Sequence, residues 1–221
     1  MKISPFLEES TKNEALKYVD RDRREHLLSL KQEKNKAQSL AAGVLLYFAL
    51  AKWDEEKTDE NETAENCLPK MVTAKQALLY ADDKKEIQVE RTPSGKPYFA
   101  DRKGLFFSLS HSEEYVACVL SDKEAGVDIQ QEKKLLSATI RERILQKEEC
   151  LPPDNLTAFF RLWASKEAFV KATGEGLKKD FRELCVNEQK GFVQDTVSGI
   201  RAKLYLFDVL PGYALALCIL R

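Results

Sequence analysis

The sequence contains little of what structural zinc sites, disulfide frameworks and membrane spans require. Its 221 residues include two histidines and five cysteines, and the cysteines are scattered without a C-x-x-C pair. This scarcity disfavours a structural zinc site and predicts reduced thiols, several of them at core positions. The longest apolar run, Leu40–Ala51, is too short for a membrane span of about 20 residues. Because the start of the chain lacks a signal-peptide pattern, we expect a soluble, cytoplasmic protein with no membrane partner.

Glycine and proline are also sparse, at nine and seven residues, which excludes collagen-like and low-complexity chains. The formal net charge is -1, from 35 basic and 36 acidic residues. The segment Asp54–Glu65 holds seven of the acids and one lysine, so we expect a solvated acidic loop there and a mildly basic remainder. That charge balance suits an anionic small molecule or an acidic protein partner better than nucleic acid.

Apolar residues at helical spacing predict that the first half of the chain is mainly helical. Lys36–Lys52 carries the core-facing stripe of a buried helix, and Asn13–Lys34 predicts one long surface helix or two short ones. Val72–Tyr80 forms a third candidate helix. In the second half the longest predicted helix is Asn155–Thr173, which ends at a C-capping Gly174.

From Leu105 onward the hydrophobic period changes to two, which is typical of strands. The apolar run Tyr213–Leu220 predicts a central strand, because it is apolar on both faces. Two consecutive hairpins are predicted from the strand-length runs 105–110, 115–120 and 125–130.

Helices and hairpins in both parts of the chain indicate an α+β fold with an antiparallel sheet in each half. The turn-rich segment Pro93–Lys103 marks the boundary between the halves. We therefore expect an N-terminal half-domain over 1–100 and a C-terminal half-domain over 101–221.

One acid lies on the line of the helix that should be buried. The stripe through Phe159, Trp163 and Val170 also contains Glu167. Burying a carboxylate there costs roughly several kcal/mol unless a cation or a hydrogen-bond donor pairs with it. Lys171, one turn further, is a candidate partner, and the alternative is an ordinary i,i+4 surface ion pair.

A second acid lies inside a predicted strand. Alternation places Val127 and Ile129 on one face and Asp128 and Gln130 on the other. Aspartate is disfavoured in strand interiors, so Asp128 needs a partner or a cation, unless it lies at a frayed strand end. If Asp128 meets Glu167, the two carboxylates form an oxygen site that suits Mg²⁺.

Ser110 and His111 are adjacent, which invites comparison with hydrolases. Neighbouring residues on a strand point to opposite faces, so they form a poor nucleophile–base pair, and no G-x-S-x-G motif is present. His111 is better placed to donate to a phosphate oxygen, and the alternative, which is favoured for this residue taken alone, is a satisfied turn histidine. In the same way Lys96, in a Gly-Lys-Pro turn, is either solvated or a phosphate contact.

The N-terminal helical region carries a basic cluster. It is either a charged helix face or a contact for a phosphate monoester. Its members are Arg21, Arg23, Arg24 and His26.

Taken together, these residues make the chain similar to Sfp-type 4'-phosphopantetheinyl transferases. The similarity is firm over roughly residues 95–177 and looser from about residue 14 to the C-terminus. The motifs that carry it, in the order of the family, are Gly95-Lys96-Pro97, the run Phe107–Ser112, Gly126-Val127-Asp128-Ile129, and the block Trp163–Lys171 followed by Gly174–Leu177.

The resemblance implies a monomer of two similar α+β halves related by a pseudo-two-fold axis, with coenzyme A in the cleft between them. It implies transfer of 4'-phosphopantetheine from coenzyme A to a serine of an acyl or peptidyl carrier protein. The reaction depends on Mg²⁺ and releases adenosine 3',5'-bisphosphate. Because the serine nucleophile belongs to the carrier protein, no activated serine or cysteine is needed in this chain.

The family's site residues map onto matching positions of this chain. Glu167 is also our candidate for accepting the serine proton, and with Lys171 it forms the expected catalytic pair. The resemblance assigns Mg²⁺ to Asp128 and Glu167, phosphate contacts to Lys96, Ser110, His111 and Lys171, and, on a weak match, the 3'-phosphate to Arg23 with Arg24 or His26.

Gln130 departs from the pattern, because many family members carry glutamate there. Its amide oxygen is expected to be a third metal ligand, or else water takes its place. Either way the site has one negative charge less, which predicts weaker metal affinity rather than loss of activity.

Two other classes of function remain as alternatives. One is another Mg²⁺-dependent enzyme that cleaves phosphodiesters, although a nucleic-acid substrate would require a broader basic surface. The other is a non-catalytic regulator that binds coenzyme A or a carrier protein.

Overall fold

The computed structural model describes residues 1–56, 68–81, 87–133, 138–146, 149 and 151–221. The predicted acidic loop falls mostly on residues outside these ranges. Its first acids, Asp54 to Glu56, are not in a loop but in the last turn of a long helix, α3 (Glu33–Glu56).

Helices dominate the N-terminal part of the chain, as predicted. The segment expected to form one or two helices forms two short α-helices joined by a 3₁₀ turn, and the buried helix is longer than predicted. The elements in order are η1 (Ser4–Leu7), α1 (Glu9–Ala15), η2 (Leu16–Tyr18), α2 (Arg21–Ser29), α3 and α4 (Ala74–Ala81).

Strands and two further helices follow. A short pair precedes the strands that the change of period predicted, and the longest helix of this part ends at Gly174 in the left-handed conformation, as expected. The elements are β1 (Val89–Arg91), β2 (Pro97–Phe99), β3 (Phe106–Ser112), β4 (Tyr115–Ser121), β5 (Ala125–Gln131), α5 (Ala138–Ile144), α6 (Leu156–Thr173), η3 (Gly176–Lys178), η4 (Phe181–Glu183), β6 (Leu184–Asn187), β7 (Phe192–Asp195), β8 (Arg201–Phe207) and β9 (Tyr213–Leu220).

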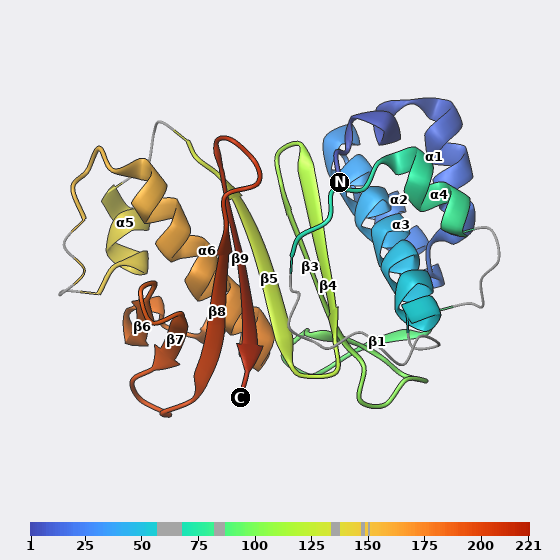
Figure 1. The fold of residues 1–221 in the computed structure, drawn as a ribbon. Helices are drawn as coiled ribbons and strands as arrows, with labels where there is room; N and C mark the ends of the chain where they lie inside the picture. The colour runs from blue at the N-terminus through green and yellow to red at the C-terminus, as the bar shows by residue number, and fades with distance from the viewer. Residues whose placement is uncertain (57–67, 82–86, 134–137, 147–148, 150) are drawn as a thin grey trace.

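The strands form antiparallel sheets, which confirms the α+β prediction. β1 pairs with β2, β3 pairs with β4, and the remaining strands form one sheet in the order β5-β9-β8-β7-β6. Figure 1 shows α6 lying across one face of this larger sheet, with the N-terminal helices on the other side of the β3–β4 hairpin.

The second predicted hairpin is wrong. β5 pairs with β9, so that Asp128 lies opposite Ala216, and not with β4. The reason is the apolar character of β9: a strand that is buried on both faces lies between two neighbours, here β5 and β8.

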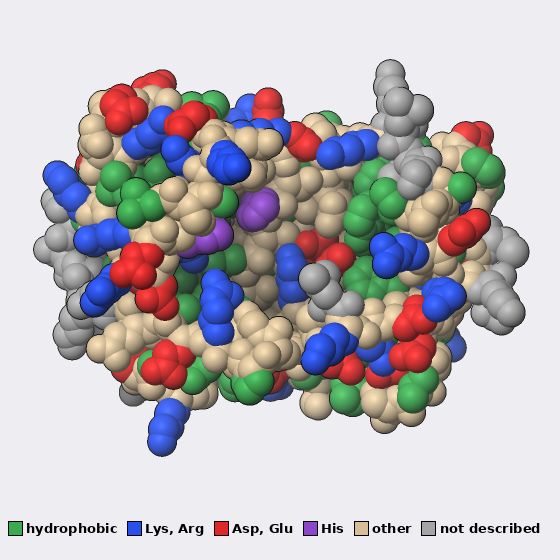
Figure 2. Space-filling view, turned by 180° about the vertical axis from the view of Figure 1, so that it is seen from behind, with side chains coloured by type: hydrophobic (Ala, Val, Ile, Leu, Met, Phe, Trp, Pro, Cys, Tyr) green, Lys and Arg blue, Asp and Glu red, His purple; other side chains and the backbone are tan. Residues whose placement is uncertain are grey.

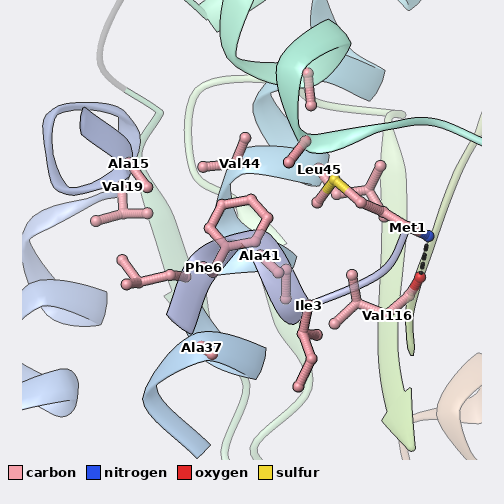
Figure 3. Packing of buried hydrophobic residues seen from close by; sticks show 14 of the residues in the cluster. Met1, Ile3, Phe6, Ala15, Val19, Ala37, Ala41, Val44, Leu45 and Val116 are labelled. Atoms are coloured by element: carbon pink, nitrogen blue, oxygen red, sulfur yellow. Dashed lines mark hydrogen bonds between the residues drawn. The ribbon is translucent and has the colours of Figure 1, made fainter. Parts of the chain in front are cut away.

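One hydrophobic core joins the N-terminal helices to the β3–β4 hairpin. In Figure 3, Phe6 of η1 and Val44 of α3 pack in the same cluster as Val116 of β4, and the backbone nitrogen of Met1 donates to the Val116 carbonyl at 2.8 Å. This packing groups the hairpin with the N-terminal helices, although the predicted division at residue 100 would assign it to the second half. That division stays a prediction.

A second core lies between α6 and the larger sheet. Phe159 and Phe169 of α6 are fully buried there against Leu184 of β6 and Ala216 of β9. The long helix is therefore fixed to the sheet along its length, and the side chains on its other faces keep defined positions.

Candidate active site

β5 and α6 approach each other as backbones, because residue 126 is glycine. A Cβ atom at Gly126 would lie 2.1 Å from the Ala168 carbonyl oxygen and 2.4 Å from the Ala172 nitrogen. No side chain larger than hydrogen fits such a distance. The contact brings the next residues of β5 directly beside the helix face that carries Glu167 and Lys171.

Asp128 is buried at this contact, with 2% of its surface exposed. Its Oδ1 accepts hydrogen bonds from Lys171 Nζ and Ser110 Oγ, both at 2.7 Å, and its Oδ2 accepts one from Gln130 Nε2 at 2.8 Å. Asp128 is thus a fully partnered residue inside the sheet, not one at a frayed strand end. The ion pair expected between Lys171 and Glu167 is instead made between Lys171 and Asp128.

Glu167 lies half-buried one turn before Lys171 and accepts a hydrogen bond from Trp163 Nε1 at 3.3 Å. Burial raises the pKa of Glu167, and the negative charge of Asp128 raises it further, against the opposing effects of Lys171 and Trp163. The two carboxylates therefore lie near enough for their charges to interact, although they are far apart in the sequence.

A cleft of about 1280 Å³ opens above these residues. Glu167 and Lys171 of α6 line it together with His111 of β3, and Asp128 lies beneath them. Figure 2 shows basic and histidine side chains gathered around the hollow in the middle of this face. The basic residues that line the cleft are Arg23, His26, Arg91, Lys96, His111, Arg143, Lys171, Lys178, Lys179 and Arg182.

Ser110 and His111 point to opposite sides of β3, as strand geometry predicted. Ser110 is 5% exposed and faces β5, whereas His111 is exposed on the cleft wall. Desolvation within the cleft lowers the pKa of His111, and the positive charges of Lys171 and Arg23 lower it further while Asp128 opposes them. A neutral imidazole still donates one N–H to an anion.

Lys96 reaches across the cleft rim from the β1–β2 turn. Its ammonium donates to the Ala172 carbonyl at 2.6 Å, close to the C-terminal end of α6, and pairs with Glu124. Gly174, at a φ of +76°, leaves room for the lysine stem, because a Cβ there would lie 2.9 Å from Lys96 Cδ. The predicted cofactor-binding lysine thus lines the cleft but is already partnered.

The basic cluster of α2 divides between the cleft and the surface beside it. Arg23 and His26 line the cleft, whereas Arg24 donates to the carbonyls of Val19 and Lys17. Arg23 donates through Nη1 to the Ser39 carbonyl at 3.1 Å, and its buried Nε has no hydrogen-bond partner among the described residues. Burial lowers the pKa of Arg23.

A family model described as the 4'-phosphopantetheinyl transferase superfamily matches residues 124–218, which contain Asp128, Glu167 and Lys171. The 4'-phosphopantetheinyl transferase Sfp of Bacillus subtilis (strain 168) is 31% identical over 148 residues, which are 63% of this chain and 66% of that protein. The 4'-phosphopantetheinyl transferase psf-1 of Bacillus pumilus is 35% identical over 105 residues, 45% of either chain.

The chain belongs to the 4'-phosphopantetheinyl transferase superfamily. The aligned region spans just under two thirds of Sfp and less than half of psf-1. The superfamily match covers β5, α6 and most of β9, so the part of the fold that places the two acids is also the part that the family shares.

The residues of this superfamily member fit a divalent cation of the Mg²⁺ type. Asp128 and Glu167 are hard oxygen ligands, and the single ammonium of Lys171 leaves the carboxylate pair with a net negative charge. Mg²⁺ takes one or two carboxylates and completes its shell with water and phosphate oxygens. The described residues contain no cluster of three or more histidine, cysteine or acidic residues that could hold a metal ion.

Gln130 orients its amide nitrogen toward Asp128 Oδ2. That hydrogen bond supports Asp128 from the side, and it is a different contact from the predicted one through the amide oxygen. Metal ligation by Gln130 remains a prediction.

Sequence reasoning missed Lys166, which precedes Glu167. The side chain of Lys166 is fully buried, and its ammonium donates to the Ile144 carbonyl at 2.8 Å and to Glu149 Oε2 at 2.7 Å. Ile144 ends α5, whose residues form one wall of the cleft. No signal in a lone sequence separates such a lysine from a solvated one.

No described helix combines the length and the apolar character that crossing a bilayer would need.

Proposed function

We propose that this chain transfers 4'-phosphopantetheine from coenzyme A to a serine of an acyl or peptidyl carrier protein. The observation that carries the proposal is the meeting of Asp128, Glu167 and Lys171 under a basic cleft large enough for a nucleotide. The names of the relatives, which are 4'-phosphopantetheinyl transferases, support the same activity.

The basic residues of the cleft would bind the phosphates of coenzyme A. Lys171 donates to Asp128, to Ser110 and, most weakly, to the Val127 carbonyl at 3.2 Å, and its side chain remains 30% exposed toward the cleft. One of its N–H groups can therefore turn to a diphosphate oxygen. His111 and Lys96 would add donors, and Arg23 would meet the 3'-phosphate.

In the reaction the carrier serine oxygen forms a bond to the phosphorus that bears pantetheine. The bridging P–O bond breaks, and adenosine 3',5'-bisphosphate leaves with the bond's electrons. The serine proton goes to Glu167, directly or through one water. Without metal, burial and Asp128 raise the pKa of Glu167, and a bound divalent cation would favour its ionised form, which is the form that accepts a proton.

Asp128 and Glu167 would hold Mg²⁺, which supplies positive charge next to the diphosphate as negative charge develops there. Lys171 holds Asp128 in place from one side and Gln130 holds it from the other. These contacts fix the carboxylate before any ligand arrives, so little reorganisation is needed on binding.

We also propose the pseudo-two-fold arrangement that the family implies. α3 packs against the β3–β4 hairpin and α6 against the larger sheet, so a long helix lies on an antiparallel sheet on either side of the cleft. The monomeric state and the cytoplasmic location remain predictions.

The test is intact mass spectrometry of an apo carrier protein after incubation with coenzyme A, Mg²⁺ and this protein. We expect the carrier to gain one phosphopantetheine arm. Glu167→Gln is the matched control, because it keeps the shape and removes the charge, and it should abolish the gain. A carrier that stays unmodified although the protein binds coenzyme A would instead support a non-catalytic regulator.

A second arm offers the protein simple phosphodiesters and nucleic acid with Mg²⁺. Hydrolysis of these, without transfer to the carrier, would support the alternative of a phosphodiester-cleaving enzyme and overturn the proposal.

A further inference from the structure

Three serines of β3 contact backbone amides of β5. Ser108, Ser110 and Ser112 alternate along the strand, so all three hydroxyls point to the same face. Ser108 Oγ accepts from Val127 N at 3.2 Å, Ser110 Oγ from Ile129 N at 3.3 Å and Ser112 Oγ from Gln131 N at 2.9 Å. We call these three residues the serine seam.

The serine seam takes the place of a backbone ladder. β3 and β5 belong to different sheets, and β5 is the edge strand of the larger one. Val127 and Ile129 are almost fully buried, so their edge N–H groups need acceptors that water does not supply. The serine hydroxyls accept hydrogen bonds from these N–H groups. They also fix the register between β3 and β5, which run in the same direction.

Ser110 differs from the other two serines because it also contacts the candidate metal site. Its hydroxyl donates to Asp128 Oδ1 at 2.7 Å and accepts from Lys171 Nζ at 2.9 Å. With the bond from Ile129 N, the single proton and both lone pairs of the hydroxyl are in use. A phosphate oxygen requires a donor, and the only proton of Ser110 already goes to Asp128.

We propose that Ser110 is a positioning residue: it holds Asp128 and Lys171 in register with β3, and it does not contact the phosphates of coenzyme A. The inference rests on the proposed function for the identity of the site. It differs from the role that the family resemblance implies for this serine. In this inference the serine seam connects the β3–β4 hairpin to Asp128.

The first test follows backbone amide hydrogen exchange in Ser108→Ala, Ser110→Ala and Ser112→Ala proteins. Each substitution should speed exchange mainly at its own partner, which is Val127, Ile129 or Gln131 respectively. Unchanged exchange rates at these amides would contradict the hydrogen bonds that define the serine seam. This measurement needs neither metal nor coenzyme A, so its outcome does not depend on the proposed function.

The second test measures Mn²⁺ binding, as a probe of the Mg²⁺ site, by electron paramagnetic resonance. Ser110→Ala should weaken Mn²⁺ binding by roughly 10- to 100-fold, the usual effect of losing a group that orients a metal ligand. Ser112→Ala is the matched control: it loses one seam bond but has no contact with Asp128, and its Mn²⁺ affinity should equal that of the wild type. Equal affinity in Ser110→Ala would overturn the positioning role.

The third test measures coenzyme A binding by calorimetry without metal. A positioning residue acts through Lys171, so Ser110→Ala should lower the affinity of the wild type but not lower that of Lys171→Ala any further. A direct phosphate contact predicts the same several-fold loss in both backgrounds, which would overturn the proposal. Should Ser110→Ala fail to fold, Ser110→Cys keeps the volume and a weak donor. It should give a Mn²⁺ affinity between those of wild type and Ser110→Ala.

Wild-type protein that binds neither Mn²⁺ nor coenzyme A would count against both the proposed function and the role of Ser110 toward Asp128. The exchange experiment would then still decide whether the seam exists.

Discussion

Helix α6 makes two buried ion pairs through lysines that lie five residues apart, and the two pairs are built in opposite ways. In the Lys166–Glu149 pair the lysine is fully buried and the carboxylate is 16% exposed. In the Lys171–Asp128 pair the carboxylate is 3% exposed and the lysine is 30% exposed. In the first pair the cation, Lys166, is buried inside the fold. In the second pair the anion, Asp128, is buried, and the cation, Lys171, faces the cleft.

The difference teaches what each pair does. A sealed lysine can only hold elements together, and Lys166 joins α6 to the end of α5 through the Ile144 carbonyl. A lysine that is sealed on one side and open on the other can turn its longest hydrogen bond, here the one to the Val127 carbonyl at 3.2 Å, toward a ligand. The exposure of the lysine, and not the presence of the pair, therefore separates a structural ion pair from one in a binding site.

The largest expected effect is on stability, from Glu149→Ala. Removing one partner of a buried pair leaves the other charge unpaired, here the fully buried Lys166, so the free energy of unfolding should fall by roughly 3–5 kcal/mol. Asp128→Ala should cost clearly less, because water reaches the Lys171 ammonium that it leaves unpaired. Urea unfolding of both variants checks the contrast.

The matched control is the double variant Lys166→Met, Glu149→Leu, which removes both charges and should regain most of the lost stability. Equal costs for Glu149→Ala and Asp128→Ala would contradict the distinction between the two pairs.

The activity should depend on the pair that faces the cleft and not on the buried one. Lys171→Ala is expected to lower the rate of carrier modification by roughly 10²–10³-fold, the usual effect of removing one donor from a charged reaction site. Single-turnover mass spectrometry measures the rate, and circular dichroism verifies that the variant is folded. A variant within a few-fold of wild type would show that the open lysine is not used.

The acid beside the open lysine should make the site sensitive to pH. The pKa of Glu167 is raised in the folded protein, so its ionised form destabilises the fold above that pKa, and protonation on acidification relieves the cost. Glu167→Gln should therefore raise the melting temperature at neutral pH by about 2–4 °C, the shift that roughly 1 kcal/mol produces in a domain of this size.

Because protonation relieves that cost, the advantage of Glu167→Gln should shrink as the pH falls through the raised pKa. Melting curves of both proteins from neutral to acidic pH check this sign. A variant that melts lower than wild type at neutral pH would contradict it. Metal binding to wild type should weaken over the same range, since the protonated acid is a poor ligand.

The smallest expected effect comes from Gln130→Glu. The change replaces the amide that donates to Asp128 with a further carboxylate, so Mn²⁺ affinity should rise several-fold and stability without metal should fall slightly. Calorimetric titration of both proteins measures the change. Unchanged affinity would mean that residue 130 has no influence on the metal.

Local patterns in the sequence were sufficient for the long helices, for β3 to β5 as strands and for the two unusual acids. Each of these depends on the spacing of residues close together in the chain. The pairing of β5 with β9 was missed because it joins segments about ninety residues apart, and period-two patterns do not identify a partner.

The partner of Lys171 was missed for the same kind of reason. Helical spacing reveals only neighbours such as Glu167, whereas Asp128 lies on a strand that the fold brings alongside. The predicted buried stripe was also only partly right, since Trp163 and Glu167 are half-buried while Lys166 is fully buried. Burial of that lysine depends on α5, which packs there only in the folded chain.

The glycine at position 126 makes β5 rest on α6 with main chain against main chain. The distance between β5 and α6 is therefore set by backbone contact at this point, and it does not depend on which apolar side chains pack nearby. Substitutions of apolar residues around the helix should therefore leave the separation of Asp128 and Lys171 unchanged.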